Sequence, residues 1–397
     1  MAEVNGAGTR QLTIDGVTVD DAADCYVIAE IGHNHQGEVE QAKQLIAAAK
    51  ECGVDAVKLQ KRANRSLYTQ EFYNQPYDNE FSFGRTYGEH REALELSPDE
   101  YAELQDYARE VGIAFFATAF DFESADFLGE LDVPAFKMAS GDLRNTPLLR
   151  HVAAFGKPMI ISTGGAELSD VERAVDAVLP TNEQLCILQC TAAYPADTDD
   201  LNLGVITTLR ERYPGLVIGL SDHQNGIAMA LVAYMLGARV IEKHFTLNHA
   251  AKGTDHAFSL MPEGMRKLVR DLQRVPGALG DGVKRSLPVE EQPIRKMGKK
   301  LVAARELDQG HVLTPDDLAI RSPADGGLPP YELDRLVGRR LRRSVAFEDF
   351  VTFDDVEPAA EPPVRAQRGP GQGVRGNREV PPADGPTGAG AHAATQP

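Results

Sequence analysis

Residues 215–246 read GLVIGLSDHQNGIAMALVAYMLGARVIEKHFT, and this stretch decides the predicted fold. Two short apolar runs rich in β-branched residues, Val217–Leu220 and Val240–His244, flank a segment of helical composition. A strand, a helix and a second strand in this order predict two parallel strands joined by a crossover helix. The same pattern recurs upstream, with further strand-like runs at Tyr26–Ile31, Asp55–Leu59, Ile113–Thr118, Ala135–Ala139, Pro158–Ser162 and Leu185–Gln189.

Eight such runs, spread over about 250 residues, match the size of an α/β fold of the (β/α)8 TIM barrel type. Amphipathic segments separate the runs, and Met261–Leu272 has the pattern of the helix that closes the last unit. A doubly wound open sheet is the weaker alternative, because no glycine fingerprint follows the first run. The predicted helices include Glu38–Glu51, Pro98–Val111, Asp121–Glu130, Pro147–Phe155 and Leu168–Val178.

The composition along the chain predicts five segments. Residues 1–20 form an N-terminal extension, 21–280 the barrel, 281–296 a linker, and 297–357 a small β-rich domain. Residues 358–397 contain almost no large apolar side chains, so we predict a disordered tail. One insertion, 62–96, interrupts the regular spacing after the second strand, and a loop there is expected to cover the mouth of the barrel.

The overall composition is that of an ordinary globular protein, with 42% hydrophobic and 25% charged residues. A formal charge of −18 argues against nucleic acid and anionic membrane as partners, because both reward a basic surface. The N-terminal residues do not have the pattern of a signal peptide and the apolar runs are only strand-length, so we expect a cytoplasmic protein. The cysteines lack zinc-ligand spacing and are predicted to be buried free thiols: Cys25, Cys52, Cys186 and Cys190.

Polar side chains gather where the predicted strands end, and in a barrel these ends share one face. Lys58 and Lys137 stand within otherwise apolar runs, where an ammonium group is costly unless an anion compensates it. One alternative for each lysine is a structural salt bridge with Glu30 or Glu242. Hydroxyl groups at the strand ends favour instead a cage for a phosphate or carboxylate, made by Thr118, Ser140, Ser162 and Ser221.

His223 and His244 stand at the ends of the last two strands and are expected to project into the same space. Neutral imidazole suits Mn, Fe, Co or Zn, and two protein ligands leave a catalytic metal with open positions for water and substrate. A single histidine at a strand end is more often a hydrogen-bonded core residue. For His223 and for His244 this is the alternative to binding a metal. The pairing beside the lysine cage favours the metal site.

Nine blocks occur in order along the chain: YVIAEIGHNHQG, DAVKLQ, FFATAFD, FKMASGD, PMIISTGGA, LQCTAAYPA, GLSDH, VIEKHFT and KGTDHAFSL. These blocks resemble the barrel of the N-acetylneuraminate (sialic acid) synthase family and of its legionaminic, pseudaminic and spore-coat relatives. The resemblance runs from Tyr26 to Ser259. It resumes in the second domain, which is similar to the antifreeze-like (SAF) domain fused to these synthases.

The resemblance implies an aldol-type condensation of phosphoenolpyruvate with an N-acetylmannosamine-like aldose, which yields a nonulosonic acid and inorganic phosphate. In such enzymes the enol carbon attacks the sugar aldehyde, which a metal polarises as a Lewis acid. Water then adds, and phosphate leaves with cleavage of its C–O bond. By the same resemblance His223 and His244 hold the metal, Mn²⁺ in first place with Mg²⁺ or Co²⁺ as alternatives. The implied phosphoenolpyruvate ligands are Lys58, Thr118, Lys137, Ser140, Ser162 and Ser221.

Further roles follow from the family pattern. It implies that Glu30 and Asp255 bind or position the sugar, that Gln60 lines the site and that Tyr194 contacts the substrates. Members of the family are usually domain-swapped homodimers, in which the SAF domain of one subunit covers the barrel of the other and contributes an arginine. Arg321 in the block AIRSPADGG matches that arginine.

This chain departs from the family pattern at three positions. Asp142 stands where bacterial sialic acid synthases usually carry a glutamate with a proposed acid–base role, so we take Asp142, with Glu30 and Tyr194, as a candidate catalytic residue. The shorter side chain changes its reach by about 1.5 Å, which is enough to alter rate or acceptor. Ala192 replaces a residue that is often polar, and His33 is also atypical, with a hydrogen-bonded loop histidine as its simpler interpretation.

Three other functions are weighed against a sialic acid synthase. The first is an enzyme of the same class whose product is another sugar acid, of the legionaminic, pseudaminic, spore-coat or secondary-metabolite type. A metal-dependent barrel hydrolase would leave the two lysines unexplained. A non-catalytic sugar-binding homologue is expected to have lost Lys137, His223 or His244, and all three are retained.

Overall fold

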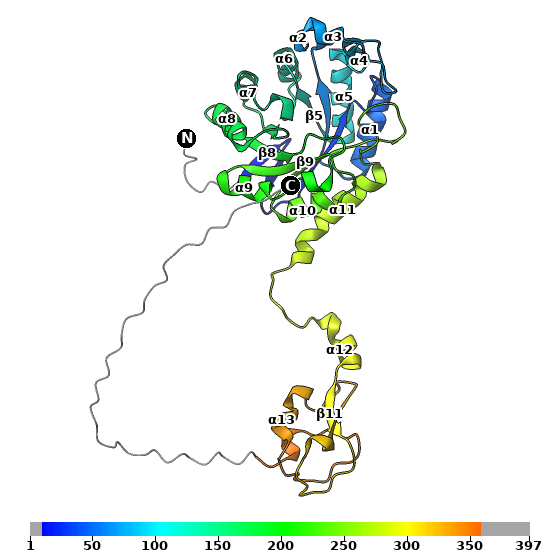
Figure 1. Ribbon diagram of the computed structural model, residues 1–397, viewed down its shortest axis with the longest axis vertical. Helices are drawn as coiled ribbons and strands as arrows, with labels where there is room; N and C mark the ends of the chain where they lie inside the picture. The colour runs from blue at the N-terminus through cyan, green and yellow to red at the C-terminus, as the bar shows by residue number, and fades with distance from the viewer. Residues whose placement is uncertain (1–9, 359–397) are drawn as a thin grey trace, which may run out of the picture. The chain divides into compact units, whose positions relative to one another are not determined.

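The computed structural model describes residues 10–358, which divide into two compact units (Figure 1). The first unit ends at Gly282 and the second begins at Val283. The predicted disordered tail, 358–397, lies outside the described residues except for Pro358. The first nine residues of the predicted N-terminal extension also lie outside them.

Eight parallel strands close into a barrel in the first unit, in the order β10-β3-β4-β5-β6-β7-β8-β9. Each strand begins and ends within two residues of a predicted run, so the (β/α)8 prediction is confirmed. Strand residues are almost all buried, because helices cover the outside of the barrel and side chains fill its inside. The strands are β3 (Tyr26–Gly32), β4 (Ala56–Lys61), β5 (Ala114–Ala119), β6 (Phe136–Met138), β7 (Met159–Ser162), β8 (Leu185–Cys190), β9 (Val217–Asp222) and β10 (Val240–His244).

The strand register brings polar residues of neighbouring strands level with one another. Glu30 of β3 pairs with Lys58 of β4 on one side and with His244 of β10 on the other. Glu242 of β10 pairs with Ser221 of β9. Because the strands are parallel, these residues all lie toward the carboxyl end of the barrel, where active sites of this fold are built.

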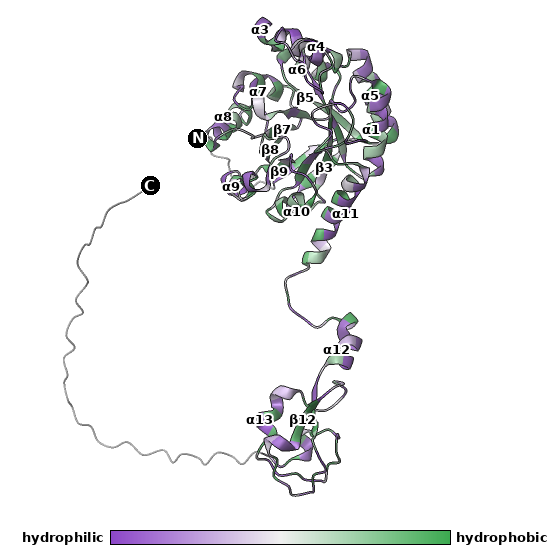
Figure 2. Ribbon diagram, turned by 45° about the vertical axis from the view of Figure 1, so that its right-hand side comes forward, coloured by the Kyte–Doolittle hydropathy of each residue, from purple (hydrophilic) through white to green (hydrophobic). Residues whose placement is uncertain are grey.

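Helices between the strands surround the barrel, and Figure 2 shows α1 and α5 with both hydrophilic and hydrophobic residues. The α5 helix begins with a capping box between Ser97 and Glu100 and ends at Val111, and the φ of 74° at the following Gly112 favours glycine. Its buried face includes Tyr101 and Leu104. The barrel helices are α1 (Val39–Glu51), α5 (Pro98–Val111), α6 (Phe122–Glu130), α7 (Thr146–Ala153), α8 (Leu168–Val178), α9 (Val205–Arg212), α10 (Ala228–Met235) and α11 (Pro262–Leu279).

The last barrel helix, α11, continues to Leu279 rather than ending at the predicted Leu272. The added residues, 273–279, are exposed or half-buried, and Pro276 has no N–H to donate to the carbonyl group four residues before it. The second half of the predicted linker is also helical, because α12 (Glu291–Met297) occupies it. The short 3-10 helix Pro288–Glu290 precedes α12.

A β-hairpin precedes the barrel where the sequence suggested only an extension. It is formed by β1 (Gln11–Ile14) and β2 (Val17–Asp20), and Asp15 and Gly16 make its turn with positive φ angles. Leu12, Ile14 and Val19 are buried in the barrel core. Arg10 donates from Nε to the carbonyl oxygen of Leu216, just before β9, at 2.7 Å. The hairpin therefore packs at the amino-terminal end of the barrel, opposite the site.

The insertion after β4 folds into three short helices, α2 (Asn64–Leu67), α3 (Gln70–Tyr73) and α4 (Tyr87–Ala93). Aromatic rings hold it together, with the Phe72 and Tyr87 centroids 4.6 Å apart and those of Tyr77 and His90 also 4.6 Å apart. Phe83, His90 and Arg91 of this insertion line the cavity at the mouth of the barrel, as predicted for a covering segment.

The second unit is small, with a separate core that includes Leu301, Leu307, Leu313 and Leu336. Its two antiparallel strands are β11 (Lys300–Ala303) and β12 (Leu318–Arg321), and α13 (Leu333–Leu336) follows them. Short 3-10 turns and isolated bridges connect the rest. Within the part of the chain that the structure describes, no helix is long and apolar enough to cross a membrane.

Candidate active site

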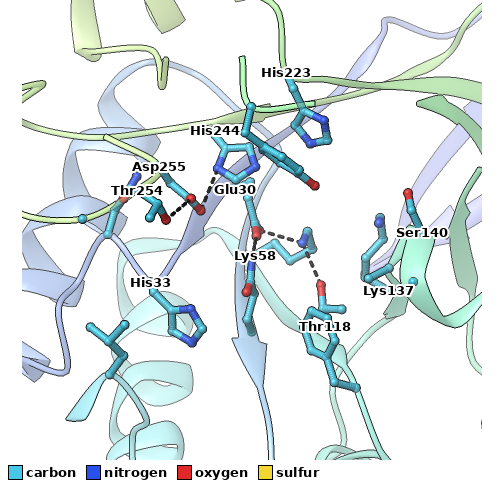
Figure 3. Close-up of a pocket in the computed structure, with 18 of the residues that line it drawn as sticks. Glu30, His33, Lys58, Thr118, Lys137, Ser140, His223, His244, Thr254 and Asp255 are labelled. Carbon is cyan, nitrogen blue, oxygen red and sulfur yellow. Dashed lines mark hydrogen bonds and ion pairs between the residues drawn. The ribbon is translucent and has the colours of Figure 1, made fainter. Parts of the chain in front are cut away.

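A cavity of about 420 Å³ lies at the carboxyl end of the barrel (Figure 3). Five cationic side chains and three carboxylates line it, although the whole chain carries a formal charge of −18. This local excess of positive charge favours an anionic ligand. The predicted site residues that line the cavity are Glu30, Lys58, Gln60, Thr118, Lys137, Ser140, Ser162, Tyr194, Ser221, His223, His244 and Asp255.

Lys58 is fixed in the cavity by two buried partners (Figure 3). Its Nζ lies 2.7 Å from Oε2 of Glu30 and donates to Oγ1 of Thr118 at 2.8 Å. Gln60 donates from Nε2 to the other oxygen of Glu30, also at 2.7 Å. Burial raises the pKa of Glu30 and the Lys58 ammonium opposes that rise. The salt bridge considered as an alternative for Lys58 therefore exists, and the ammonium still lines the cavity.

Lys137 is held more loosely, beside Glu242. The Lys137 Nζ lies 3.7 Å from Oε1 of Glu242, beyond hydrogen-bond length, and the Lys58 Nζ lies 3.7 Å from Oε2. Burial acts to raise the pKa of Glu242, but Lys137 and Lys58 together lower it below its ordinary value. The glutamate is thus ionised, while Lys137 makes one hydrogen bond, to the Met138 carbonyl oxygen at 3.2 Å.

Two serine hydroxyls lie on the same wall as Lys137. Among the described residues the buried Ser162 Oγ has no hydrogen-bond partner. The Ser140 Oγ accepts from the Gly164 backbone N–H at 3.0 Å, and a Cβ at position 164 would come within 2.8 Å of that oxygen. The unused N–H groups of Lys137 and the free Ser162 hydroxyl are donors without acceptors, which a bound oxyanion would satisfy.

The two predicted metal ligands face each other, with ring centroids of His223 and His244 5.3 Å apart. The Nδ1 of His223 lies 2.8 Å from the Thr191 carbonyl oxygen, so it carries the proton and leaves Nε2 with a free lone pair. Burial lowers the pKa of His223 to about 4 and also lowers that of His244, so both rings are neutral at pH 7. The buried Nδ1 of His244 has no hydrogen-bond partner in the part of the chain that the structure describes, and Asp255 Oδ2 lies 3.5 Å from it.

These features fit a divalent metal with few protein ligands. Two neutral imidazoles with available lone pairs are suitable donors for Mn²⁺ or a similar ion. Within residues 10–358 no group of three or more His, Cys, Asp or Glu side chains has the arrangement of a closed metal site. A metal at His223 and His244 is therefore expected to keep positions open for other ligands.

Aromatic rings surround the histidine pair. The Tyr194 ring centroid lies 4.2 Å from that of His223, and the Phe258 centroid lies 4.8 Å from that of His244. Tyr194 is 54% exposed and stands at the mouth of the cavity, where it is available to a substrate.

One predicted site residue of the first unit, Asp142, does not line this cavity. Asp142 belongs to the short 3-10 helix Ser140–Asp142 and follows the lining residues Ser140 and Gly141. Its Oδ1 accepts from Asn145 Nδ2 at 3.3 Å. Arg321 ends β12 in the second unit, where its side chain is exposed.

The Asp142 carboxyl should make the stability of the protein depend on pH. Burial raises its pKa to about 6, against roughly 3.9 in an unfolded chain. Between these values the folded protein holds a proton that the unfolded chain has released, so the free energy of unfolding falls as pH rises through this window. Asp142→Asn removes the effect and should be more stable than the parent by about 1 to 2 kcal/mol at pH 8, with no difference near pH 4.

Denaturant unfolding of both proteins at the two pH values measures this difference. A stability gap of equal size at pH 4 and pH 8 would show that Asp142 titrates normally.

The cavity also contains cations that the sequence-based prediction omitted: Arg62, Arg91 and Lys252. Arg62 comes one residue after the end of β4. The rule that polar residues at the carboxyl ends of barrel strands line the site, which points to Lys58 and Gln60, could therefore have included Arg62. Lys252 lies in a loop and begins the family block KGTDHAFSL, so the block could have pointed to it. Arg91 lies in α4, and none of the quoted blocks includes it. The cysteine prediction is confirmed, because all four cysteines are buried and free.

A closed (β/α)8 barrel, with an anion-binding wall beside two neutral histidines, defines a barrel enzyme that acts on an anionic substrate. Comparison with family models identifies the family: the NeuB family model matches residues 45–284 and the SAF domain model matches residues 300–357. The chain belongs to the NeuB family and is an enzyme of the sialic acid synthase type. The predicted resemblance is thereby confirmed.

Characterised relatives are similar over most of their length. The N-acetylneuraminate-9-phosphate synthase of Homo sapiens is 42% identical over 84% of this chain and 93% of its own. The N,N'-diacetyllegionaminic acid synthase of Legionella pneumophila is 37% identical over 84% of this chain and 95% of its own. Among solved structures, the sialic acid synthetase from Leptospira borgpetersenii, in complex with citrate, matches 72% of this chain and 95% of its own with a TM-score of 0.62 and 30% identity.

Proposed function

We propose that this enzyme condenses phosphoenolpyruvate with an N-acetylmannosamine-like aldose to give a nonulosonic acid and inorganic phosphate. The observation that carries the proposal is that an anion-binding wall and a pair of neutral histidines share one cavity. The anion-binding wall suits the negative charges of phosphoenolpyruvate, and the histidine pair suits a metal that binds an aldehyde oxygen. In the overall reaction a C–C bond forms, one water is consumed, and the C–O bond to phosphate breaks.

The residues of the cavity divide between the two substrates. Lys58, with Thr118, and Lys137, with the free Ser162 hydroxyl, offer charged and neutral donors to the oxygens of phosphoenolpyruvate. Ser140 and Ser221 lie on the cavity wall and complete this group. The metal, when bound at His223 and His244, supplies Lewis-acid polarisation of the sugar aldehyde.

The sugar is assigned to the opposite part of the cavity. Glu30 and Asp255 supply carboxylate oxygens that accept from sugar hydroxyls, and Gln60 holds the Glu30 carboxylate in place. Tyr194, exposed at the mouth, covers the sugar. The relatives carry different product names, so a legionaminic, pseudaminic or other sugar acid is the second candidate product. Ala192 lines the cavity without the polar side chain that is often found at this position in the family.

A phosphate-release assay tests the proposed reaction. Phosphoenolpyruvate and Mn²⁺ are supplied with a panel of 2-acetamido hexoses, and the condensation product is identified by mass spectrometry. Release of phosphate should require both phosphoenolpyruvate and an aldose. If no aldose in the panel releases phosphate, the proposed function fails.

We also propose that the protein works in the cytoplasm as a homodimer in which Arg321 acts on the barrel of the partner subunit. Arg321→Ala and Lys137→Ala should each be inactive or nearly so alone. Mixed and allowed to exchange subunits, they should recover up to about a quarter of the parent activity, since a heterodimer then contains one intact site.

Arg342→Ala, which removes another arginine of the second unit, is the control and should be active alone. If mixing restores nothing although mass spectrometry shows heterodimers, Arg321 does not act in trans.

A further inference from the structure

Two charged residues in the sequence blocks GLSDH and VIEKHFT have no part in the proposed reaction. Asp222 ends β9 immediately before His223, and Lys243 immediately precedes His244 in β10. The two strands are paired so that Asp222 and Lys243 lie directly opposite each other. Each of these charged residues is therefore the neighbour in the chain of one predicted metal ligand.

The two charged side chains point away from the cavity. Successive residues of a strand face opposite sides of the sheet, and the preceding residues, Ser221 and Glu242, line the cavity. Asp222 and Lys243 therefore face the helices that surround the barrel, and neither is among the described residues that line the cavity. Any effect that they have on a bound metal must pass through the neighbouring residues of the chain.

Asp222 and Lys243 form a buried ion pair, which we call the outer ion pair. Lys243 Nζ lies 2.7 Å from Oδ2 of Asp222, and the two side chains are only 1% and 0% exposed. Apolar side chains of similar volume often stabilise such a position as well or better, because both charges lose their hydration on burial. Stability therefore does not by itself account for the outer ion pair.

The outer ion pair also holds the residue that follows His223. The second Asp222 oxygen, Oδ1, accepts from the Gln224 backbone N–H at 2.9 Å. The Lys243 ammonium donates to the Gln224 carbonyl oxygen. The chain is thus attached to Lys243 on both sides of His223, through Asp222 before it and through Gln224 after it.

Regular strand pairing does not reach His223. The ladder between β9 and β10 ends with the pair of Asp222 and Lys243, one residue before this histidine. His244, in contrast, lies within β10 and is paired with Glu30 of β3. The position of His223 relative to His244 therefore depends on contacts beyond the ladder.

Other contacts of His223 come from the segment that follows β8. Its carbonyl oxygen accepts from the Ala196 backbone N–H at 3.1 Å, and its Nδ1 lies 2.8 Å from the Thr191 carbonyl oxygen. These contacts position His223 relative to β8. The link between the segment around His223 and β10, the strand that carries His244, comes from Lys243.

We propose that the outer ion pair is a positioning element for the metal site: it sets the separation of His223 and His244 and thereby the affinity for a divalent ion. The inference rests on the metal site of the proposed function and adds two positioning residues to it. With only two protein ligands, the site depends on the placement of each imidazole. Groups that orient metal ligands change affinity or activity by about 10- to 100-fold when they are replaced.

The test removes both charges at once, because removal of one alone would leave the other buried and unpaired. The double variant Asp222→Leu with Lys243→Met keeps similar side-chain volumes and should unfold at a temperature close to that of the parent. Calorimetric titration should show Mn²⁺ binding weakened about 10- to 100-fold. The dissociation constant of phosphoenolpyruvate at saturating Mn²⁺ should stay within about threefold of the parent value, because Lys58 and Lys137 are unchanged.

The matched control is the double variant Lys61→Met with Glu95→Leu. Lys61 ends β4 and lies 2.6 Å from Oε1 of Glu95, with both side chains 11% exposed, and neither residue adjoins a histidine of the metal site. Loss of this pair should leave the Mn²⁺ affinity at the parent value.

A gentler variant gives the reading if the first double variant does not fold. Lys243→Gln keeps an N–H donor for Asp222 on a side chain that is one bond shorter, so the contact with the Gln224 carbonyl oxygen is lost. It should weaken Mn²⁺ binding about tenfold.

Weaker Mn²⁺ binding with unchanged binding of phosphoenolpyruvate supports the inference, whether or not an accepted aldose has been found. Parental Mn²⁺ affinity in the folded variant would overturn it and leave the outer ion pair with a role in stability alone. Equal weakening of Mn²⁺ and phosphoenolpyruvate would also overturn it, since the pair would then support the whole mouth of the barrel. If the parent binds no Mn²⁺, or His223→Ala binds it equally well, the proposed metal site has failed and the inference fails with it.

Discussion

Replacement of Lys137 by methionine should lower kcat/KM for phosphoenolpyruvate by about 100-fold or more. The substitution keeps the length of the side chain but removes an ammonium group that is only 3% exposed and has unused N–H donors. Loss of one partner from a buried charge interaction costs about 2 to 5 kcal/mol, and each 1.4 kcal/mol is a factor of ten. The same change removes one of the two ammonium groups that lower the pKa of Glu242, so that pKa should rise although Lys58, at 3.7 Å, and the Ser221 hydroxyl remain beside it.

Steady-state phosphate release at varied phosphoenolpyruvate measures the effect, and thermal unfolding shows whether the variant is folded. Lys157→Met is the matched control, because Lys157 pairs with Asp132 at the surface, with 38% of its side chain exposed. It should keep parental kinetics. A folded Lys137→Met protein with kcat/KM within threefold of the parent would remove Lys137 from the substrate site and leave it with a structural ion pair.

His223→Ala should abolish both tight Mn²⁺ binding and at least about 99% of the activity. His223 is one of two neutral imidazoles available to a metal, and its tautomer is set by the Thr191 carbonyl oxygen. Substitution of groups that merely orient a metal ligand costs about 10- to 100-fold in affinity or activity, so loss of the ligand itself should cost more. The parent enzyme, stripped by a chelator, should regain activity with Mn²⁺, whereas the variant should not.

Metal content after dialysis gives a reading that does not depend on turnover. His151→Ala is the control, since His151 lies on α7 with its Nε2 2.6 Å from Asp126 and is partly exposed. It should bind Mn²⁺ as the parent does. Equal metal content in the parent and in His223→Ala would contradict the metal site, whatever the activity shows.

The barrel and most of its site were predictable because the information is local. The barrel strands have three to seven consecutive residues, so each is recognised from a short stretch of sequence, and the residue that ends it is known with it. Closure of parallel strands then brings all these ends to one face, so Lys58, Lys137, His223 and His244 could be grouped before any distance was known. The family blocks include the same strand ends. The position of residues at strand ends and the family resemblance therefore point to the same residues.

The departures from the predictions arise where contacts between distant segments decide. The N-terminal hairpin is an exception, because apolar and polar residues alternate around Asp15-Gly16, a local signal that the prediction did not use. The burial of Leu12 and Ile14 in the barrel core is the long-range part of this difference. The continuation of α11 beyond Leu272 and through Pro276 also differs from the prediction, since a proline usually ends or kinks a helix. Asp142 follows a lining residue in the chain but does not line the cavity itself, since the 3-10 turn directs it toward Asn145.

By itself, the sequence determined the class of fold, the position of each strand end and hence the two lysines and two histidines of the site. Only the tertiary structure decided how those charges are compensated: Lys58 is paired closely with Glu30, and Lys137 is left with free donors. It also decided that Arg62 and Arg91 meet at opposite nitrogens of His33. The reason is physical: the position of a strand in the sequence follows from local periodicity, whereas charge compensation depends on distances between side chains that are far apart in the chain.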